Sequence, residues 1–225
     1  TAVITGASSG LGKTLALDLA REQMNLTLAA RNADALTQIA TQVKKLGSEV
    51  LVQPTDVTEQ AQCQVMIERT IEKFGQIDYL ILNAGISMWV RFDEITDISI
   101  LHKVMDTNYF GAVNCILPAL PHLRHNRGVI VAISSAQAVI GVPHHTGYSA
   151  SKHALRGFLE ALEFEMGDAI HILNVMPGWI RDTNLRENAL AGDGKRLSGT
   201  PQHDDQAVGL KECSARIISS MRKRR

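Results

Sequence analysis

Several features that mark specialised protein classes are absent from this chain of 225 residues or scarce in it. It has three cysteines, which are far apart, odd in number and without the spacing of metal ligands, so we expect neither a disulfide framework nor a metal site. Free cysteines favour a reducing, cytoplasmic compartment. No apolar run is long enough to span a bilayer. The formal net charge is zero, which gives no indication of a nucleic-acid partner.

Apolar, β-rich runs alternate with helical patterns along most of the chain, and 45% of the residues are hydrophobic, enough for one well-buried domain. This alternation is typical of a parallel sheet covered by helices on both faces. The predicted fold class is α/β, a Rossmann-like doubly wound parallel sheet in three layers, as a single domain over residues 1–225. We expect strands at residues 2–5, 26–30, 50–52, 78–82, 128–133 and 171–175, and two long helices at residues 98–122 and 148–166.

A glycine-rich turn follows the first expected strand and leads into a helical pattern of leucines. The turn is Gly6-Ala7-Ser8-Ser9-Gly10-Leu11-Gly12. Such a turn lets the backbone approach a pyrophosphate, and the helix N-terminus aims N–H groups at the anion. A tight turn without a ligand is the alternative. Gly12-Lys13-Thr14 also resembles the end of a P-loop, but a P-loop requires glycine at the position of Ala7, so we do not expect hydrolysis of nucleotide triphosphates.

A tyrosine and a lysine lie four residues apart in the second long helical pattern. Tyr148 and Lys152 therefore share one face of the expected helix. A free phenol with a pKa near ~10 is a poor base at neutral pH, and a fixed cation nearby favours the phenolate. We therefore expect Lys152 to bring the pKa of Tyr148 toward the working range. An ordinary amphipathic helix that carries the same pair is the alternative.

These motifs and several others follow the order and spacing of one known family. The set comprises Thr5 to Gly12, Asp56-Val57, Asn83-Ala84-Gly85, Asn108, Ser135, Tyr148 with Lys152, and Pro177-Gly178. Each motif is weak alone, but the ordered set resembles the signature of the short-chain dehydrogenase/reductase family. The resemblance extends from the first residues to position 178. It implies a dinucleotide cofactor and hydride transfer.

The resemblance also implies which residues hold the cofactor, and it assigns Lys152 to the nicotinamide ribose. The expected cofactor-binding residues are Gly6, Ser8, Ser9, Gly10, Leu11 and Gly12 in the turn, Asp56 and Val57 at the adenine, Asn83, Ala84 and Gly85 beside the adenosine half, and, elsewhere, Tyr148, Lys152, Pro177, Gly178 and Thr183.

The end of the second expected strand indicates which dinucleotide is bound. Enzymes that use NAD place an acidic residue there, which holds the ribose hydroxyls and repels a 2′-phosphate. This chain has Ala30 followed by Arg31, whose guanidinium can pair with the phosphate without an opposing carboxylate. We therefore expect NADP(H). A solvent-exposed loop arginine is the alternative for Arg31, but it does not account for the missing acid.

Four residues are expected to carry the chemistry. Tyr148 donates a proton to the substrate oxygen as hydride reaches the carbonyl carbon, and Lys152 shifts the pKa of the phenol. Ser135 hydrogen-bonds the charge that develops on that oxygen. Because Ser135 lacks the flanking glycines of a nucleophile elbow, a triad hydrolase is not expected. Asn108 positions the water that returns a proton to Lys152, and a structural role that ties helix to sheet is an equal alternative.

The segment of residues 180–206 breaks the alternation, because it is polar and too long for a tight connection. Ligands of an open α/β sheet bind beyond the carboxyl ends of the strands, so we expect a substrate lid, with an ordinary disordered loop as the alternative. His144 and His145 are interpreted as lining the substrate mouth rather than as acid or base. Trp179 is a candidate for substrate or nicotinamide contact, and core packing is as compatible with its position.

Together these features predict an NADP(H)-dependent oxidoreductase that interconverts a carbonyl and a secondary alcohol. A catalytically silent dinucleotide-binding regulator on the same fold is the alternative. The chain starts inside a strand, and no strand follows its last helical pattern, so we expect further residues at both ends.

The resemblance also implies a homodimer or homotetramer, in which the two long helices pair with their symmetry mates. The second helix is expected to present more apolar surface than the sheet needs. The side chains in question are Ala154, Leu155, Phe158, Leu159, Leu162 and Met166.

Overall fold

Six parallel strands form one sheet in the computed structural model, which describes residues 1–197 and 207–223. The strands are β1 (Ala2–Thr5), β2 (Leu26–Ala30), β3 (Val50–Pro54), β4 (Tyr79–Leu82), β5 (Val129–Ile133) and β6 (His171–Val175). Their order across the sheet is β3-β2-β1-β4-β5-β6, so the direction of winding reverses between β1 and β4. In an open α/β sheet, ligands bind at such a reversal, beyond the carboxyl ends of the strands.

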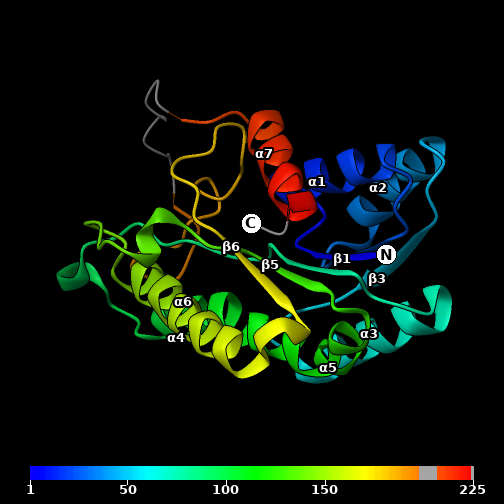
Figure 1. The fold of residues 1–225 in the computed structure, drawn as a ribbon. Helices are drawn as coiled ribbons and strands as arrows, with labels where there is room; N and C mark the ends of the chain where they lie inside the picture. Colours follow the sequence, from blue (N-terminus) through cyan, green and yellow to red (C-terminus); the bar gives the residue numbers. More distant parts are fainter. Residues whose placement is uncertain (198–206, 224–225) are drawn as a thin grey trace.

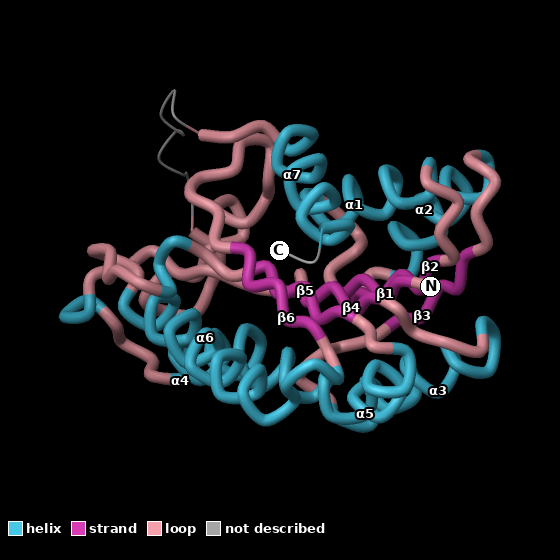
Figure 2. The backbone as a smooth tube through the Cα atoms, viewed as in Figure 1, coloured by secondary structure: helices cyan, strands magenta, loops and turns pink. Residues whose placement is uncertain are grey.

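Helices cover both faces of this sheet, which gives three layers (Figure 1). One face carries α1 (Gly10–Arg21), α2 (Ala33–Lys45) and α7 (Leu210–Lys223), and the other carries α3 (Gln60–Phe74), α4 (Ser99–Met105), α5 (Gly111–Asn126) and α6 (Thr146–Met166) (Figure 2). Shorter helical segments are η1 (Phe92–Glu94), η2 (Asp106–Phe110), η3 (Ala136–Ala138) and η4 (Gly167–Ala169). In the described ranges, none of the helices has the length and apolarity needed to cross a membrane.

The strands are apolar along their length because both faces of the sheet are buried. In β1, Ala2 and Ile4 pack in a core with α1, α2 and α7, whereas Val3 packs in a second core with α3, α5 and α6. Successive side chains of a strand point to opposite faces, so a short apolar run serves both cores. The predicted doubly wound α/β fold is confirmed, and each predicted strand is present within two residues of its expected ends.

The first long helix differs from its prediction. Residues 98–122 were expected to form one regular helix, but the chain forms α4, then the π-helical segment η2, then α5, which ends at Asn126. The wider π turn inserts one extra residue, which the hydrophobic period does not reveal. Asn108 lies in this turn.

The apolar surface predicted on α6 is for the most part not free. Leu155, Leu159 and Leu162 are buried in the core between α6 and the sheet, so their assignment to surplus surface is wrong. Phe158 is partly buried, and its ring meets that of Tyr109 edge to face at 6.0 Å between centroids. These side chains serve to cover the sheet of their own chain.

The predicted lid is described only over residues 180–197, since residues 198–206 lie outside the described ranges. The described part forms no helix and no strand of the sheet. Isolated bridges join Ile180 to Val208 and Leu190 to Met88. This segment is therefore held beside the loop that follows β4.

Candidate active site

The loops that follow β1, β4, β5 and β6 meet at the carboxyl edge of the sheet. Hydrogen bonds join them in pairs, from the Asn83 amide to the Gly6 carbonyl at 3.1 Å and from the Ala136 N–H to the Pro177 carbonyl at 2.9 Å. Parallel strands bring their carboxyl ends together, so residues far apart in sequence become neighbours here. The predicted site residues of these loops therefore lie along one edge of the sheet, and their roles stay predictions.

The turn after β1 leaves no room for side chains at two of its glycines. A Cβ on Gly12 would lie 2.4 Å from the carbonyl oxygen of Gly6, and a Cβ on Gly6 would lie 2.9 Å from Cα of Ala84. Gly6 also has a φ of +64°, which favours glycine. Asn83 supports the turn because its Nδ2 donates to the carbonyl oxygens of Thr5 and Gly6 at 2.9 and 3.1 Å.

The N-terminus of α1 faces the same edge. Ser9 is its N-cap, and the Ser9 side chain makes no capping hydrogen bond. Gly10 has a φ of +52°, and a Cβ there would approach only the Thr183 side chain, at 3.9 and 4.0 Å. The turn and Thr183 thus line a space at the positive end of the helix dipole, which suits a phosphate-bearing group. The side chain of Leu11 is buried in the core, so only its backbone faces this space.

Arg31 and Asp56 follow β2 and β3 at the adjoining part of the edge. Asp56 Oδ1 accepts hydrogen bonds from the N–H and the hydroxyl of Thr58 at 3.0 and 2.8 Å. Asp56 Oδ2 lies 4.0 Å from Nη1 of Arg31, whose side chain is 76% exposed. The expectation that no carboxylate opposes Arg31 is therefore wrong, because Asp56 lies beside it. A long, exposed ion pair is weak, so Arg31 remains able to turn to a stronger anion.

Asn108 joins the loop after β4 to α6. Its Oδ1 accepts from the N–H of Ile86 at 2.9 Å, and its Nδ2 donates to the Ile86 carbonyl at 2.9 Å and to Ser151 Oγ at 3.0 Å. A Cβ on Gly85 would lie 3.2 Å from Asn108 Oδ1, so glycine allows this close approach. The amide has the tying role that was the structural alternative, and its role toward a water stays a prediction.

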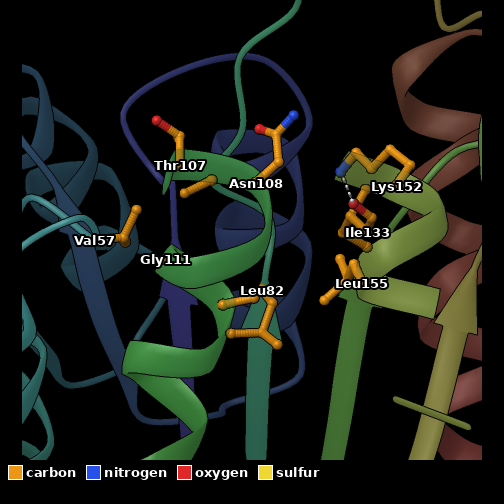
Figure 3. A pocket seen from close by; sticks show the side chains of 10 residues that line it. Val57, Leu82, Thr107, Asn108, Gly111, Ile133, Lys152 and Leu155 are labelled. Carbon is orange, nitrogen blue, oxygen red and sulfur yellow. Dashed lines mark hydrogen bonds between the residues drawn. The ribbon is translucent and has the colours of Figure 1, made fainter. Parts of the chain in front are cut away.

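A small cavity lies beside Asn108 and Lys152 (Figure 3). Its volume is about 10 Å³, close to the space that one water molecule needs. Figure 3 shows the Lys152 side chain reaching Ile133, where Nζ donates to the backbone carbonyl at 3.1 Å. The further lining residues are Val57, Leu82, Ala84, Thr107, Gly111, Ala112 and Leu155.

Tyr148 and Lys152 are both buried on α6, and Lys152 Nζ lies 5.7 Å from the centroid of the Tyr148 ring. Burial raises the pKa of Tyr148 to about 12, while a hydrogen bond with Ser135 acts in the opposite direction. Burial lowers the pKa of Lys152 to about 8. The pKa of Tyr148 is thus raised by burial instead of lowered as predicted, and at neutral pH the site holds a neutral phenol beside a cation.

Ser135 caps the short helix η3 directly after β5, and its Oγ accepts from the N–H of Gln137 at 3.1 Å. The adjoining Ala136 N–H donates to the carbonyl of Pro177, which follows β6. Pro177 thus supports the turn that carries the serine. A Cβ on Gly178 would meet no atom within 4 Å, so this glycine borders open space.

Both tryptophans of the chain lie next to His145. The centroid of the His145 ring is 4.8 Å from that of Trp89, 5.8 Å from Tyr148 and 6.0 Å from Trp179. The Arg186 guanidinium lies 3.6 Å from the centroid of Trp179 and 5.6 Å from that of Trp89. These residues form an aromatic wall beside Tyr148. Trp179 and His145 were candidates from the sequence, whereas Trp89, Arg186 and Gln137 lie outside the recognised motifs and could not be identified from it.

Backbone hydrogen bonds hold the three loops of this wall together. The N–H of Trp89 donates to the Leu190 carbonyl, and the N–H of Leu190 donates to the Ser87 carbonyl, each at 3.0 Å. The N–H of Val90 donates to the carbonyl of His144, whose ring stacks on Trp89 at 5.4 Å. The described part of the predicted lid is thus anchored beside the site.

Comparison with known proteins agrees with this arrangement. The family model for short chain dehydrogenases matches residues 1–193. An 11-beta-hydroxysteroid dehydrogenase A of Arachis hypogaea is 41% identical over 193 residues, 85% of this chain and 55% of that protein. The 11-beta-hydroxysteroid dehydrogenase 1A of Arabidopsis thaliana is 36% identical over 214 residues, 95% of this chain and 61% of that protein. The chain spans less than two thirds of the length of these curated relatives.

A solved structure shares the whole architecture. It is an alcohol dehydrogenase of the archaeon Thermococcus sibiricus, complexed with 5-hydroxy-NADP. The TM-score is 0.85 at 26% identity, over 98% of this chain and 89% of that chain. With the family model covering most of the described residues and the motifs in place at the sheet edge, the chain belongs to the short-chain dehydrogenase family.

Proposed function

We propose that this chain is an NADP(H)-dependent oxidoreductase that interconverts a carbonyl and a secondary alcohol. The observation that carries the proposal is the meeting of Ser135, Tyr148 and Lys152 at the sheet edge that also carries the glycine turn. A silent dinucleotide-binding protein needs the turn but has no need of a buried phenol, a buried cation and a serine hydroxyl together.

The glycine turn fits the pyrophosphate of a dinucleotide. Gly10 and Thr183 border the space at the N-terminus of α1, where backbone N–H groups would hold the anion. Ala30 and Arg31 favour NADP(H) over NAD(H), because Arg31 can exchange its exposed contact with Asp56 for the 2′-phosphate. The complex of the Thermococcus sibiricus enzyme with 5-hydroxy-NADP supports this choice.

When bound, the cofactor supplies or accepts the hydride. Tyr148, protonated at neutral pH, donates its phenolic proton to the substrate oxygen in the direction of reduction. The Ser135 hydroxyl stabilises charge on that oxygen. Lys152 holds a proton at Nζ, beside the small cavity. A water in that cavity, positioned by Asn108, can return a proton to Lys152 after the proton has been passed on.

The substrate carries its carbonyl or hydroxyl on an apolar body. The wall formed by Trp89, Tyr148 and Trp179 places aromatic rings next to the reacting group, which suits an apolar body. The names of the hydroxysteroid dehydrogenase relatives make a ketosteroid one member of a sensible test panel.

The test measures NADPH oxidation by the purified protein with cyclohexanone, acetophenone, benzaldehyde and a ketosteroid, and NADPH binding in parallel. We expect reduction of at least one carbonyl, with higher kcat/KM for NADPH than for NADH. Binding of NADPH without turnover of any carbonyl, or of the corresponding alcohols with NADP, would favour the silent regulator instead.

We further propose a homodimer or homotetramer in which α5 and α6 meet their symmetry mates. Leu117 on α5 and Phe164 on α6 are 59% and 89% exposed, and Phe110 in η2 is 49% exposed. Figure 1 shows α5 and α6 on the same face of the sheet. An isologous contact over this face would bury these side chains.

A further inference from the structure

Gln137 connects the serine turn to the helix that carries Tyr148. It lies in η3 and is 5% exposed. Its backbone N–H donates to Ser135 Oγ at 3.1 Å. Its side chain reaches the start of α6, where Oε1 accepts from Ser149 Oγ at 2.9 Å and Nε2 lies 2.7 Å from His145 Nδ1. One buried residue therefore contacts both halves of the site.

The backbone contact restricts the Ser135 hydroxyl. An oxygen that accepts a hydrogen bond from Gln137 has its proton and its second lone pair directed elsewhere. The Ser135 side chain also lies near enough to the phenol of Tyr148 to lower its pKa. The hydroxyl is thereby held between the η3 turn and Tyr148, where a substrate oxygen must bind.

The side-chain contacts determine the tautomer of His145. Because Ser149 donates to Oε1 of Gln137, the amide group that faces His145 is Nε2, which is a donor. An Nδ1 that accepts a hydrogen bond carries no proton, so neutral His145 has its proton on Nε2.

The surroundings of His145 keep the ring neutral. It faces Tyr148 on α6, His144 in the preceding loop and Arg186 in the segment after β6. Burial, then the charge of Arg186, then that of His144 lower the pKa of His145 to about 4. A neutral ring of one tautomer therefore stands in the aromatic wall beside the catalytic phenol.

We propose that Gln137 is a positioning residue of the reaction, which holds the His145 ring and the Ser135 turn in fixed positions relative to Tyr148. The inference rests on the proposed function. Gln137 does not contact the reacting atoms, and it acts through Ser135 and His145.

The first variant is Gln137→Met, which removes both side-chain hydrogen bonds at similar volume and retains the backbone N–H. We expect kcat for the best carbonyl of the panel to fall about tenfold or more, since small misplacements of catalytic groups cost this much. The Kd for NADPH is expected to stay within about threefold, because Gln137 does not border the glycine turn. Gln64→Met, at an exposed position on α3, is the matched control.

The second variant is Gln137→Glu, which gives a readout that a purely structural role would not move. A carboxylate accepts from both neighbours, so His145 must place a proton on Nδ1, and its pKa rises. The pH profile of kcat/KM should then gain a step at about pH 6–7, where His145 takes up its second proton. Nitrogen NMR of labelled histidine shows directly which ring nitrogen carries the proton. We expect the proton of His145 on Nε2 in the wild type and a protonated Nδ1 in the variant.

The proposal is overturned if Gln137→Met keeps kcat within about twofold of the wild type, or if wild-type His145 carries its proton on Nδ1. If Gln137→Met does not fold, Gln137→Glu and the NMR measurement decide the question. A wild type that turns over no carbonyl contradicts the proposed function, whereas the tautomer still tests the Gln137–His145 arrangement separately.

Discussion

Lys152 Nζ lies 5.7 Å from the centre of the Tyr148 ring, one helical turn along α6, and donates a hydrogen bond to the Ile133 carbonyl. This hydrogen bond holds the ammonium group beside the ring of Tyr148. Because burial sets the pKa of Lys152 at about 8 and that of Tyr148 at about 12, both groups hold their protons at neutral pH. A reductase needs this protonation state before it delivers a proton to the substrate oxygen.

Gly12→Ala should destabilise the fold by roughly 2–4 kcal/mol, because the new Cβ would lie 2.4 Å from the Gly6 carbonyl and the backbone of the turn must shift. Gly141→Ala, in the loop before α6, is the control, because a Cβ there meets no atom within 4 Å and the stability should change by less than about 1 kcal/mol. Urea unfolding measures both. Equal stability of the two variants would show that the turn is looser than described.

Cofactor preference should change when Ala30→Asp is combined with Arg31→Ala. The 2′-phosphate loses a charge-assisted partner worth roughly 1.5–3 kcal/mol and gains a repulsive neighbour. We expect the ratio of kcat/KM for NADPH over NADH to fall by about 10–100-fold. Arg69→Ala on α3 serves as the control for loss of an exposed arginine. A wild-type preference for NADH would contradict the assignment of Arg31.

The folded protein should lose stability as the pH falls through the range set by His145. The folded pKa, lowered to about 4, lies below the unfolded value of about 6.5. As the pH falls, the unfolded state binds this proton before the folded state does. The contribution of neutral His145 to the free energy of unfolding is therefore complete above about pH 6.5 and declines toward pH 4. Between pH 7 and pH 5, His145→Gln should lose about 2 kcal/mol less than the wild type in urea unfolding. Identical pH dependence would place His145 in a solvated environment.

The proposed assembly predicts that Leu117→Lys and Phe164→Lys dissociate the protein into monomers without loss of stability. A charge on either exposed position opposes burial in an isologous contact. Sedimentation velocity compares them with Val65→Lys, an exposed position on α3. A wild type that sediments as a monomer at micromolar concentration would refute the assembly.

The strands were predictable from sequence because a parallel sheet buried on both faces requires short, continuous apolar runs. The glycine turn, Ser135, Tyr148 and Lys152 could be recognised for a similar reason, since each lies in a local motif whose spacing has a structural meaning. The described structure places each of these beside the sheet edge.

Other features depend on tertiary packing and were missed. The π turn around Asn108 leaves the hydrophobic pattern unchanged, and Leu155 appeared free because helical period alone does not say what covers a face. Trp89, Gln137 and Arg186 come from three different loops, and only the folded chain brings them to His145. Burial of Tyr148 also reversed the expected direction of its pKa shift, which spacing could not reveal.

The most direct test of the account replaces Tyr148 by phenylalanine and measures NADPH oxidation with the best carbonyl substrate, alongside NADPH binding. Tyr79→Phe, at the start of β4 and far from the carboxyl edge, is the control. The account predicts that Tyr148→Phe lowers kcat by about 10²–10⁴-fold while the Kd for NADPH changes by less than about threefold. A Tyr148→Phe protein that retains the wild-type kcat would contradict the assignment of Tyr148 as the proton donor.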